Sequence, residues 1–158
     1  MIRLAVCLLL SVAVIAAVPT QNQVHAQTKS RRDEAIVAAV EAVLEAQRNA
    51  WNRGEIEGYM DGYARSSDIT FVSGDTITRG WQTVHDRYKK NYDSREKMGT
   101  LTFSDLETRV LSDDAAVTIG RWHLQRKADQ PHGRFTLAFR RTKQGWRIIH
   151  DHTSSAAP

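Results

Sequence analysis

The chain has 158 residues, which suits a single domain, and its 22 Lys and Arg residues exceed its 18 Asp and Glu residues, giving a net charge of +4. Basic residues are interspersed with acidic ones, and no basic stripe is interleaved with aromatic residues, so we expect no nucleic-acid partner. The only cysteine is Cys7. Disulfides, thiolate metal sites and cysteine nucleophiles are therefore excluded from the rest of the chain.

Residues 1–26 have the pattern of a secretory signal peptide. A short basic start at residues 1–3 precedes an apolar run over residues 4–18, and residues 24–26 (Val-His-Ala) offer small side chains at the spacing that signal peptidase recognises. The apolar run is shorter than the roughly 20 residues that a membrane-spanning helix needs. We therefore predict cleavage after Ala26, a periplasmic or secreted location, and no membrane association after cleavage.

We expect helices in the first half of the remaining chain, after a polar leader at residues 27–32. The first helix is predicted over residues 33–53, because apolar or small side chains recur at helical spacing and Gly54 follows. A short second helix places Tyr59 and Tyr63 one turn apart. A third helix begins after Gly80 and carries a stripe of four residues, which are Trp81, Val84, Tyr88 and Tyr92.

Strands follow these helices or lie between them. Short strands are expected at residues 68–72 and 76–78, and four longer antiparallel strands follow Gly99. In the first long strand the apolar alternation changes phase, which predicts a β-bulge near Ser104 and Asp105. Helices on one side of a curved antiparallel sheet make an α+β domain.

The final strand, residues 145–154, has an apolar face that ends in two histidines. Successive side chains of a strand alternate between its two faces, so one face, expected toward the helices, carries Trp146, Ile148, His150 and His152. Asp151 is then expected on the opposite face. An apolar row that ends in imidazole groups predicts the wall of a pocket.

Two segments carry a resemblance to a known family: residues 51–56 (Trp-Asn-Arg-Gly-Glu-Ile) and the final strand. With the element order of residues 33–154, they resemble the nuclear transport factor 2-like superfamily, in particular its SnoaL-like and ketosteroid-isomerase-like group. The final strand and the tail at residues 155–158 are also similar to the association domain of calcium/calmodulin-dependent kinase. The resemblance implies a cone-shaped half-barrel of class α+β, helices that close over an internal pocket, and a homodimer.

The candidate catalytic residues are His150 and Tyr63. Imidazole titrates near neutral pH and suits a general base, and a tyrosine hydroxyl stabilises an oxyanion in ketosteroid isomerase chemistry, which the resemblance brings to Tyr63. Aromatic rings and an arginine fork suit an apolar ligand with a polar group. The candidate ligand-binding residues are Trp51, Tyr59, Trp81, Trp122, Arg141 and His152.

Alternatives remain open for these residues. Aromatic side chains at helical spacing are also typical of a core. A metal site would need a third ligand, for which His123 is a candidate, but no carboxylate with motif spacing accompanies the histidines, so we predict no metal and no cofactor. With Asp151 facing away, the pocket lacks a carboxylate base, which argues against isomerase-type proton transfer. The pocket arginines of the kinase association domain correspond here to Leu137 and Trp122, so its preference for acidic ligands does not carry over.

The sequence thus predicts an exported SnoaL-like domain whose pocket holds a small apolar or aromatic molecule. It leaves open whether the pocket also performs isomerase- or lyase-type acid–base chemistry. The alternative prediction is a non-catalytic oligomerisation or accessory domain that resembles the kinase association domain.

Overall fold

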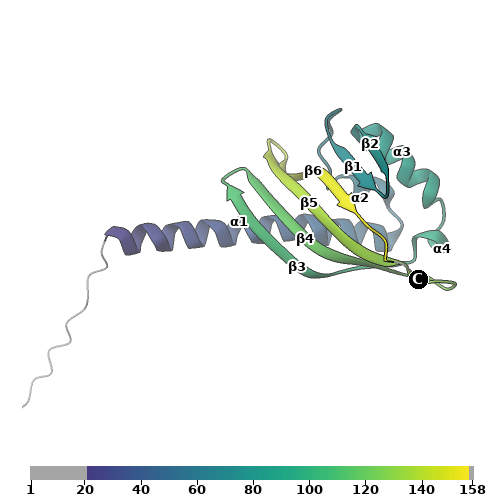
Figure 1. Cartoon of the computed structure of the whole chain (residues 1–158), viewed down its shortest axis with the longest axis horizontal. Coiled ribbons are helices and arrows are strands. Elements are labelled where there is room, and N and C mark those ends of the chain that lie inside the picture. Colours follow the sequence, from purple (N-terminus) through teal and green to yellow (C-terminus); the bar gives the residue numbers. More distant parts are fainter. Residues whose placement is uncertain (1–20, 157–158) are drawn as a thin grey trace, which may run out of the picture.

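A curved six-stranded sheet faces a layer of helices in the structure, a computed structural model that describes residues 21–156 (Figure 1). The helices are α1 (Gln21–Arg53), α2 (Ile56–Met60), α3 (Trp81–Asn91) and α4 (Arg95–Met98). The strands are β1 (Thr70–Ser73), β2 (Thr76–Arg79), β3 (Thr100–Ser112), β4 (Ala115–Gln125), β5 (His132–Thr142) and β6 (Gly145–Thr153). The predicted α+β class is confirmed.

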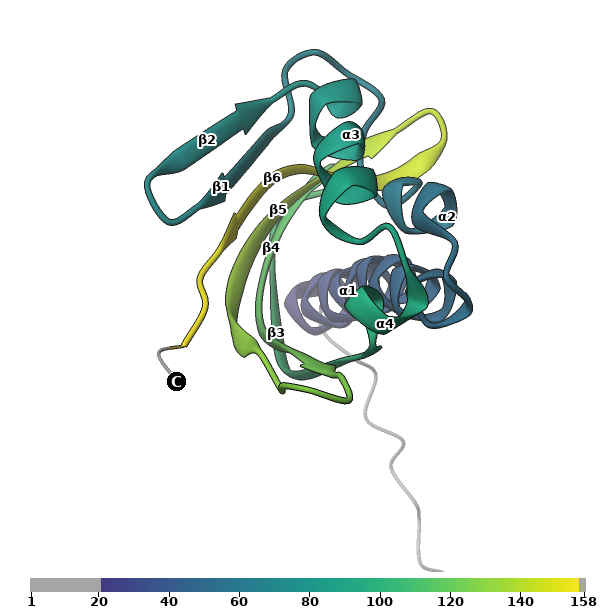
Figure 2. The ribbon, with the colours of Figure 1, turned by 90° about the vertical axis from the view of Figure 1, so that its right-hand side faces the viewer.

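The sheet has the strand order β2-β1-β6-β5-β4-β3. Neighbouring strands are antiparallel except β1 and β6, which run parallel. Figure 2 shows the sheet curving around one side of α1, while α2, α3 and α4 lie along the other side of the same space. Apolar side chains from both layers fill this space and form one core, so any cavity between the layers is walled by sheet and helices together.

Helix α1 begins earlier than the sequence pattern indicates. Residues 27–32, expected as a polar leader, continue the helix, because the Gln, Lys and Arg side chains in this segment favour helical backbone. They are exposed, and this part of α1 projects beyond the sheet (Figure 1). No helix within residues 21–156 is long and apolar enough to cross a bilayer. Most of the predicted signal peptide lies outside the described residues, and cleavage after Ala26 stays a prediction.

The chain between α2 and β1 packs tightly against α1. Helix α2 ends at Met60, and Tyr63, expected in the second helix, instead forms a parallel bridge with Ile148 of β6. Gly62 allows this approach, because a Cβ atom there would lie 2.4 Å from the Gln47 side chain of α1. Gln47 is buried, and its Nε2 donates a hydrogen bond of 2.9 Å to the backbone oxygen of Tyr59.

Strand β3 contains the predicted bulge. Its pairing with β4 shifts between Ser104 and Glu107, and Asp105 has a positive φ of 52°. The extra residue changes which side chains face the helices, so Leu101 is buried before the bulge and Leu106 is half-buried after it. A bulge bends its strand, which contributes to the curvature of the sheet.

Strand β6 contains another bulge, which the sequence analysis did not predict. Phe139 of β5 pairs with Ile148 whereas Ala138 pairs with His150, so Ile149 has no partner on β5. The side-chain alternation therefore changes phase, and Asp151 is buried. The expectation that His150 and His152 share the inner face with Ile148 is wrong. The outer edge of β6 changes partner at the same point, from Tyr63 beside Ile148 to β1 from His150 onward.

Candidate functional site

A cavity of about 130 Å³ lies between the concave face of the sheet and the helices. Its walls are rich in aromatic rings. The helices and the segment between α2 and β1 contribute Trp51, Tyr59, Tyr63, Tyr88 and Tyr92, and the strands contribute Phe71, Phe103, Trp122 and Phe135. Such walls favour an apolar or aromatic ligand, because the rings gain contact area without leaving polar groups unpaired.

Asp151 is the carboxyl group of this cavity. Its side chain lines the cavity and the residue is only 5 % exposed. The hydroxyl of Tyr63 donates a hydrogen bond of 2.6 Å to its Oδ2, while its buried Oδ1 has no hydrogen-bond partner among the described residues. Burial disfavours the carboxylate and raises the pKa of Asp151 to about 7, although the hydrogen bond from Tyr63 acts in the opposite direction.

The tyrosines around Asp151 remain protonated at neutral pH. Burial raises the pKa of Tyr59, Tyr63 and Tyr88 above the ordinary value, and the charge of the Asp151 carboxylate acts in the same direction. The hydroxyl oxygens of Tyr59 and Tyr88 are 3.4 Å apart. Only one of these two hydroxyls can donate to the other, and both also interact with the hydroxyl of Tyr63, so the three tyrosines form one hydroxyl cluster beside Asp151.

Four of the sequence-predicted site residues line the cavity: Tyr63, Tyr59, Trp51 and Trp122. A hydrogen bond of 3.0 Å fixes each indole ring. Trp51 Nε1 donates to the backbone oxygen of Met98, and Trp122 Nε1 donates to the backbone oxygen of Ser154. Trp122 therefore lies on the face of β4 that lines the cavity.

The other four predicted site residues lie outside the cavity. Beyond the bulge of β6, His150 points to the outer face of the sheet, where its Nδ1 shares a hydrogen bond with Thr70 Oγ1, and His152 is exposed. Arg141 is exposed near the end of β5, where the strand leaves the core. Trp81 begins α3 and is half-buried against the core without lining the cavity, with its Nε1 donating to the backbone oxygen of Met60.

Trp81 belongs to a cluster that joins α2 to α3 above the cavity. Its ring stacks on the imidazole of His85 at a centroid distance of 5.0 Å. His85 is buried between two carboxylates, with Nε2 2.7 Å from Glu57 Oε1 and Nδ1 3.0 Å from Asp86 Oδ1. This arrangement fixes the helices that cover the cavity.

Metal-binding groups are sparse in the part of the chain that the structure describes. Within residues 21–156, no three His, Cys, Asp or Glu side chains gather as a metal site would require. His123, the candidate third ligand, lies opposite His132 on the neighbouring strand β5, away from the strand that carries His150.

Asp151 is the cavity residue that the sequence analysis expected on the opposite face of its strand. One signal could have found it: Ile148 and Ile149 are adjacent apolar residues in an otherwise alternating strand. The same kind of phase change predicts the bulge in β3. Applied to β6, it would have turned Asp151 inward and the two histidines outward.

Comparison with known proteins identifies the family of the chain. A family model described as SnoaL-like domain matches residues 40–158. A protein of unknown function from Shewanella oneidensis, described as NTF-2 like, is 37 % identical with a TM-score of 0.72, and the match covers 75 % of this chain and 98 % of that one. The chain therefore belongs to the SnoaL-like family, and its fold is that of the nuclear transport factor 2-like proteins.

More distant solved structures share the fold alone. A putative scytalone dehydratase from Novosphingobium aromaticivorans has a TM-score of 0.69 at 7 % identity, with 81 % of this chain and 89 % of that one covered. A putative calcium/calmodulin-dependent protein kinase II association domain from Xanthomonas campestris has a TM-score of 0.60 at 18 % identity, with 74 % and 85 % covered. A search of curated proteins returns no match.

Proposed function

We propose that this SnoaL-like protein binds a small aromatic molecule in its cavity and moves a proton on that molecule with Asp151. The observation that carries the proposal is a buried carboxyl group whose pKa is raised to about 7 and whose Oδ1 is unpaired. A general acid–base group works best when its pKa lies near the working pH. Asp151 meets this condition inside a cavity whose walls are largely aromatic.

The geometry supports proton transfer next to a carbonyl group. In its carboxylate form, Asp151 accepts a proton from a carbon beside the carbonyl, and the electron pair of that C–H bond moves into the enolate. A hydroxyl of the Tyr59–Tyr88 pair donates to the enolate oxygen and stabilises it by a hydrogen bond. Protonated Asp151 then returns the proton to another carbon, which is isomerisation, or to a leaving hydroxyl, which departs as water in a dehydration.

Tyr63 has a positioning role in this proposal. Its hydroxyl donates to Asp151 Oδ2, which holds the carboxyl group in place and leaves Oδ1 without a hydrogen-bond partner in the described part of the chain. The base that the sequence suggested, His150, lies on the outer face and has no part in the proposed step. Asp151 takes the role of the base, and the Tyr59–Tyr88 pair takes the role first given to Tyr63.

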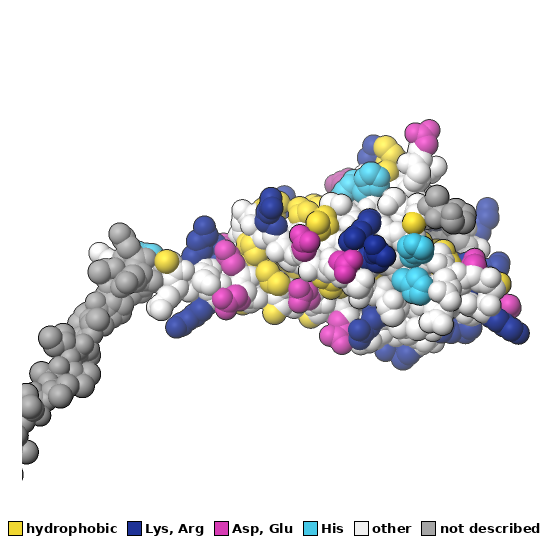
Figure 3. Space-filling view, turned by 60° about the horizontal axis from the view of Figure 1, so that its bottom comes forward, with side chains coloured by type: hydrophobic (Ala, Val, Ile, Leu, Met, Phe, Trp, Pro, Cys, Tyr) yellow, Lys and Arg dark blue, Asp and Glu magenta, His cyan; other side chains and the backbone are white. Residues whose placement is uncertain are grey.

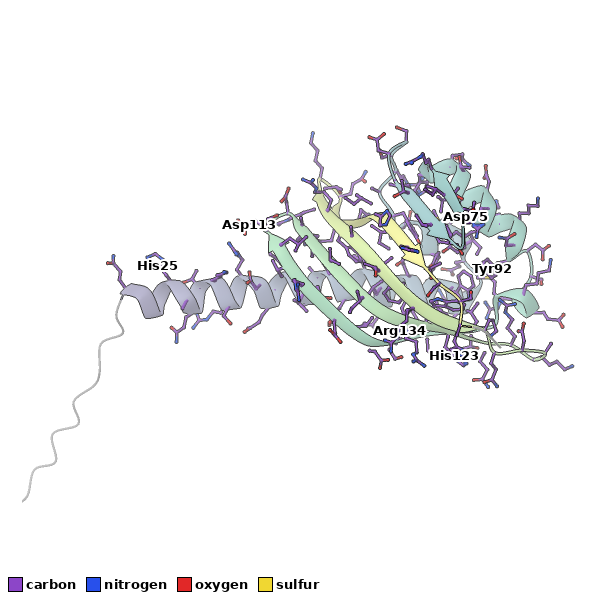
Figure 4. The ribbon with its side chains drawn as sticks, in the orientation of Figure 1. His25, Asp75, Tyr92, Asp113, His123 and Arg134 are labelled. Carbon is purple, nitrogen blue, oxygen red and sulfur yellow. The ribbon has the colours of Figure 1, made fainter. Side chains whose placement is uncertain are left out.

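Deuterium exchange tests the proposal without knowledge of the natural substrate. Acetophenone incubated with the protein in D₂O should incorporate deuterium into its methyl group, which NMR detects. Asp151→Asn should slow this exchange by about 100-fold or more, the usual effect of removing a general base. Asp75→Asn is the matched control, because Asp75 lies in the turn between β1 and β2, away from the cavity (Figure 4). Undiminished exchange in Asp151→Asn would contradict the proposal.

A second candidate function is assembly, as the similarity to the putative kinase association domain suggests. The outer face of the sheet supports a homodimer. Ile119 on β4 is 43 % exposed, and half-buried Val117 pairs with Ala138 of β5 on the same face. Figure 3 shows further hydrophobic side chains grouped among charged ones on the underside of the molecule as drawn in Figure 1. The two candidates are compatible, because the cavity and this face lie on opposite sides of the sheet.

We also propose that the protein is exported to the periplasm or secreted. The support is the basic start, apolar run and small residues of positions 1–26. Expression of the full chain in a bacterium, followed by fractionation and N-terminal sequencing, tests this proposal. Export predicts a product that begins at Gln27, and an uncut cytoplasmic product would contradict it.

A further inference from the structure

Arg87 is a cation in the cavity wall with no anionic partner. Its side chain lines the cavity, and its Cζ lies 4.9 Å from the centroid of the Phe71 ring, another wall residue. The ion pairs of residues 21–156 do not include Arg87. By contrast, the nearby Arg126, whose Cζ lies 5.9 Å from the Tyr92 ring centroid, pairs with Asp129. An arginine fork left free in a pocket wall suits a carboxylate or another planar anion.

Further polar groups lie with Arg87 at the mouth of the cavity. Asn91 is one helical turn farther along α3, so its side chain lies on the same face of the helix, and Ser73 at the end of β1 also lines the cavity. Neither side chain has a hydrogen-bond partner within the described residues. Asn91 and Ser155 are exposed, which places the mouth at this end. Figure 4 shows Tyr92 on the α3–α4 side, at the end of the molecule that also carries His123 and opposite the end with Asp113.

The cavity therefore has two chemically different ends. Asp151 lies deep inside, and burial and the Tyr63 hydroxyl set its pKa without a contribution from Arg87. The charge of Arg87 acts instead on Tyr92, where it opposes the effect of burial on the pKa. Apart from the tyrosines, Asp151 and Arg87 are the only ionisable residues among positions 21–156 that line the cavity. A ligand that satisfies both ends carries an anion at one end and a neutral oxygen function at the other.

We infer that the ligand is an aromatic carboxylic acid, held with its carboxylate on Arg87, Asn91 and Ser73 at the mouth and its ring among the aromatic walls. This inference rests on the proposed function, because it takes the far end of the ligand to be the carbonyl or hydroxyl group on which Asp151 acts. The carboxylate accepts hydrogen bonds from the Arg87 guanidinium and the Asn91 amide, and Ser73 offers a hydroxyl. Binding energy at the mouth then fixes how far the reacting group enters the cavity.

A matched pair of probes tests the inference: 4-acetylbenzoate, which has a methyl ketone opposite a carboxylate, and its neutral amide, 4-acetylbenzamide. Isothermal titration calorimetry on the protein should show the acid binding about tenfold more tightly than the amide. One charge-assisted hydrogen-bonded contact at a partly exposed site contributes an affinity gain of this size. The preference should decrease at high salt, because screening weakens the charge contact. Equal affinity for the two probes, or undetectable binding of the acid, overturns the inference.

The Arg87→Met variant tests whether Arg87 causes the preference for the acid over the amide. The Met side chain keeps an apolar contact with Phe71 and removes the fork, so the acid and the amide should bind with equal affinity, while Arg87→Lys keeps the charge and should retain part of the preference. Lys90→Met is the control, since Lys90 is an exposed residue of the same helix that does not line the cavity. An unchanged preference in Arg87→Met overturns the inference.

Asp151→Asn separates this inference from the proposed function. The variant should still prefer the acid over the amide, because Arg87 is intact, and it should lose deuterium exchange into the methyl group of bound 4-acetylbenzoate. If the wild-type protein prefers the acid and catalyses no exchange, the acid site stands and the proposed proton transfer fails. If exchange proceeds equally with both probes and neither binds more tightly, the proton transfer stands and the acid site fails.

Discussion

At the scale of single residues, the fold buries the carboxyl group of Asp151 in surroundings that disfavour its charged form. The ordinary pKa of an aspartate is 3.8, and burial raises that of Asp151 to about 7. The folded state therefore holds this proton more tightly than the unfolded chain does. The stability linked to Asp151 is complete below about pH 4 and is lost as the pH rises through about 7, so the group opposes folding above neutral pH.

This linkage predicts that Asp151→Asn stabilises the fold at high pH. Asn keeps the shape of the side chain and an oxygen that accepts the Tyr63 hydrogen bond, but it cannot ionise. The free energy of unfolding of the variant should match that of the wild type near pH 4 and exceed it at pH 8 by at most about 4 kcal/mol, from a shift of about three pKa units. Urea titrations between pH 4 and pH 8 measure this difference. A constant difference across that range would contradict the raised pKa.

At the scale of elements, the position of the site depends on how closely the chain after α2 approaches α1. Tyr63 reaches Asp151 because Gly62 lets the backbone lie against Gln47, and Gln47 in turn donates to the oxygen of Tyr59. These contacts are buried, so the local backbone has little freedom to move. The positions of Tyr59 and Tyr63 beside Asp151 thus depend on the close contact between Gly62 and Gln47.

Gly62→Ala should therefore destabilise the protein by about 1–3 kcal/mol, the usual cost of overpacking a core. The added Cβ would lie 2.4 Å from Gln47, and the clash displaces either the helix or the segment that carries Tyr63. Chemical denaturation gives the change in the free energy of unfolding. Gly74→Asn is the control, because no atom lies within 4 Å of a Cβ there and Asn tolerates its positive φ. Equal stability of Gly62→Ala and wild type would contradict this packing.

Local patterns predict most elements of this fold. Helix α3 follows from its apolar stripe, and the phase change in β3 predicts the bulge near Asp105, because both signals are contained in a few neighbouring residues. Uninterrupted alternation places Asp151 on the wrong face, and the adjacent Ile148 and Ile149 are the one local sign of the phase change. The face that Asp151 occupies depends on the pairing of β6 with Tyr63 and then with β1, and these partners lie far away in the sequence. The position of Arg87 at the mouth likewise requires the folded arrangement of α3 over β1.

At the scale of the whole molecule, the curved sheet separates two different surfaces. Its concave face and the helices enclose the cavity, while its convex face exposes Ile119 and pairs Val117 with Ala138. Exposed apolar side chains grouped on one face commonly mark a contact with another chain. The resemblance to nuclear transport factor 2-like proteins predicts the cone shape, but the cavity's acid and cation are visible only in the structure.

Ile119→Asp should convert a dimer into a monomer. The substitution places a carboxylate from each subunit in an apolar contact, where burial of an unpaired charge is unfavourable. Size-exclusion chromatography with light scattering measures the molar mass. Ile77→Asp is the control, since Ile77 is 55 % exposed on β2, at the edge of the sheet. A wild-type monomer, or a dimer that persists in Ile119→Asp, would contradict assembly through this face.

The titration of Asp151 tests the central claim most directly. Carbon-detected NMR of the side-chain carboxyl groups, assigned by comparison with Asp151→Asn, should show one aspartate in the wild-type protein that titrates with a pKa of about 7. In Tyr63→Phe this pKa should rise further, because the hydrogen bond that favours the carboxylate is lost. A pKa near the ordinary value of 3.8 would show that Asp151 is ionised throughout the neutral range and would contradict the proposed acid–base site.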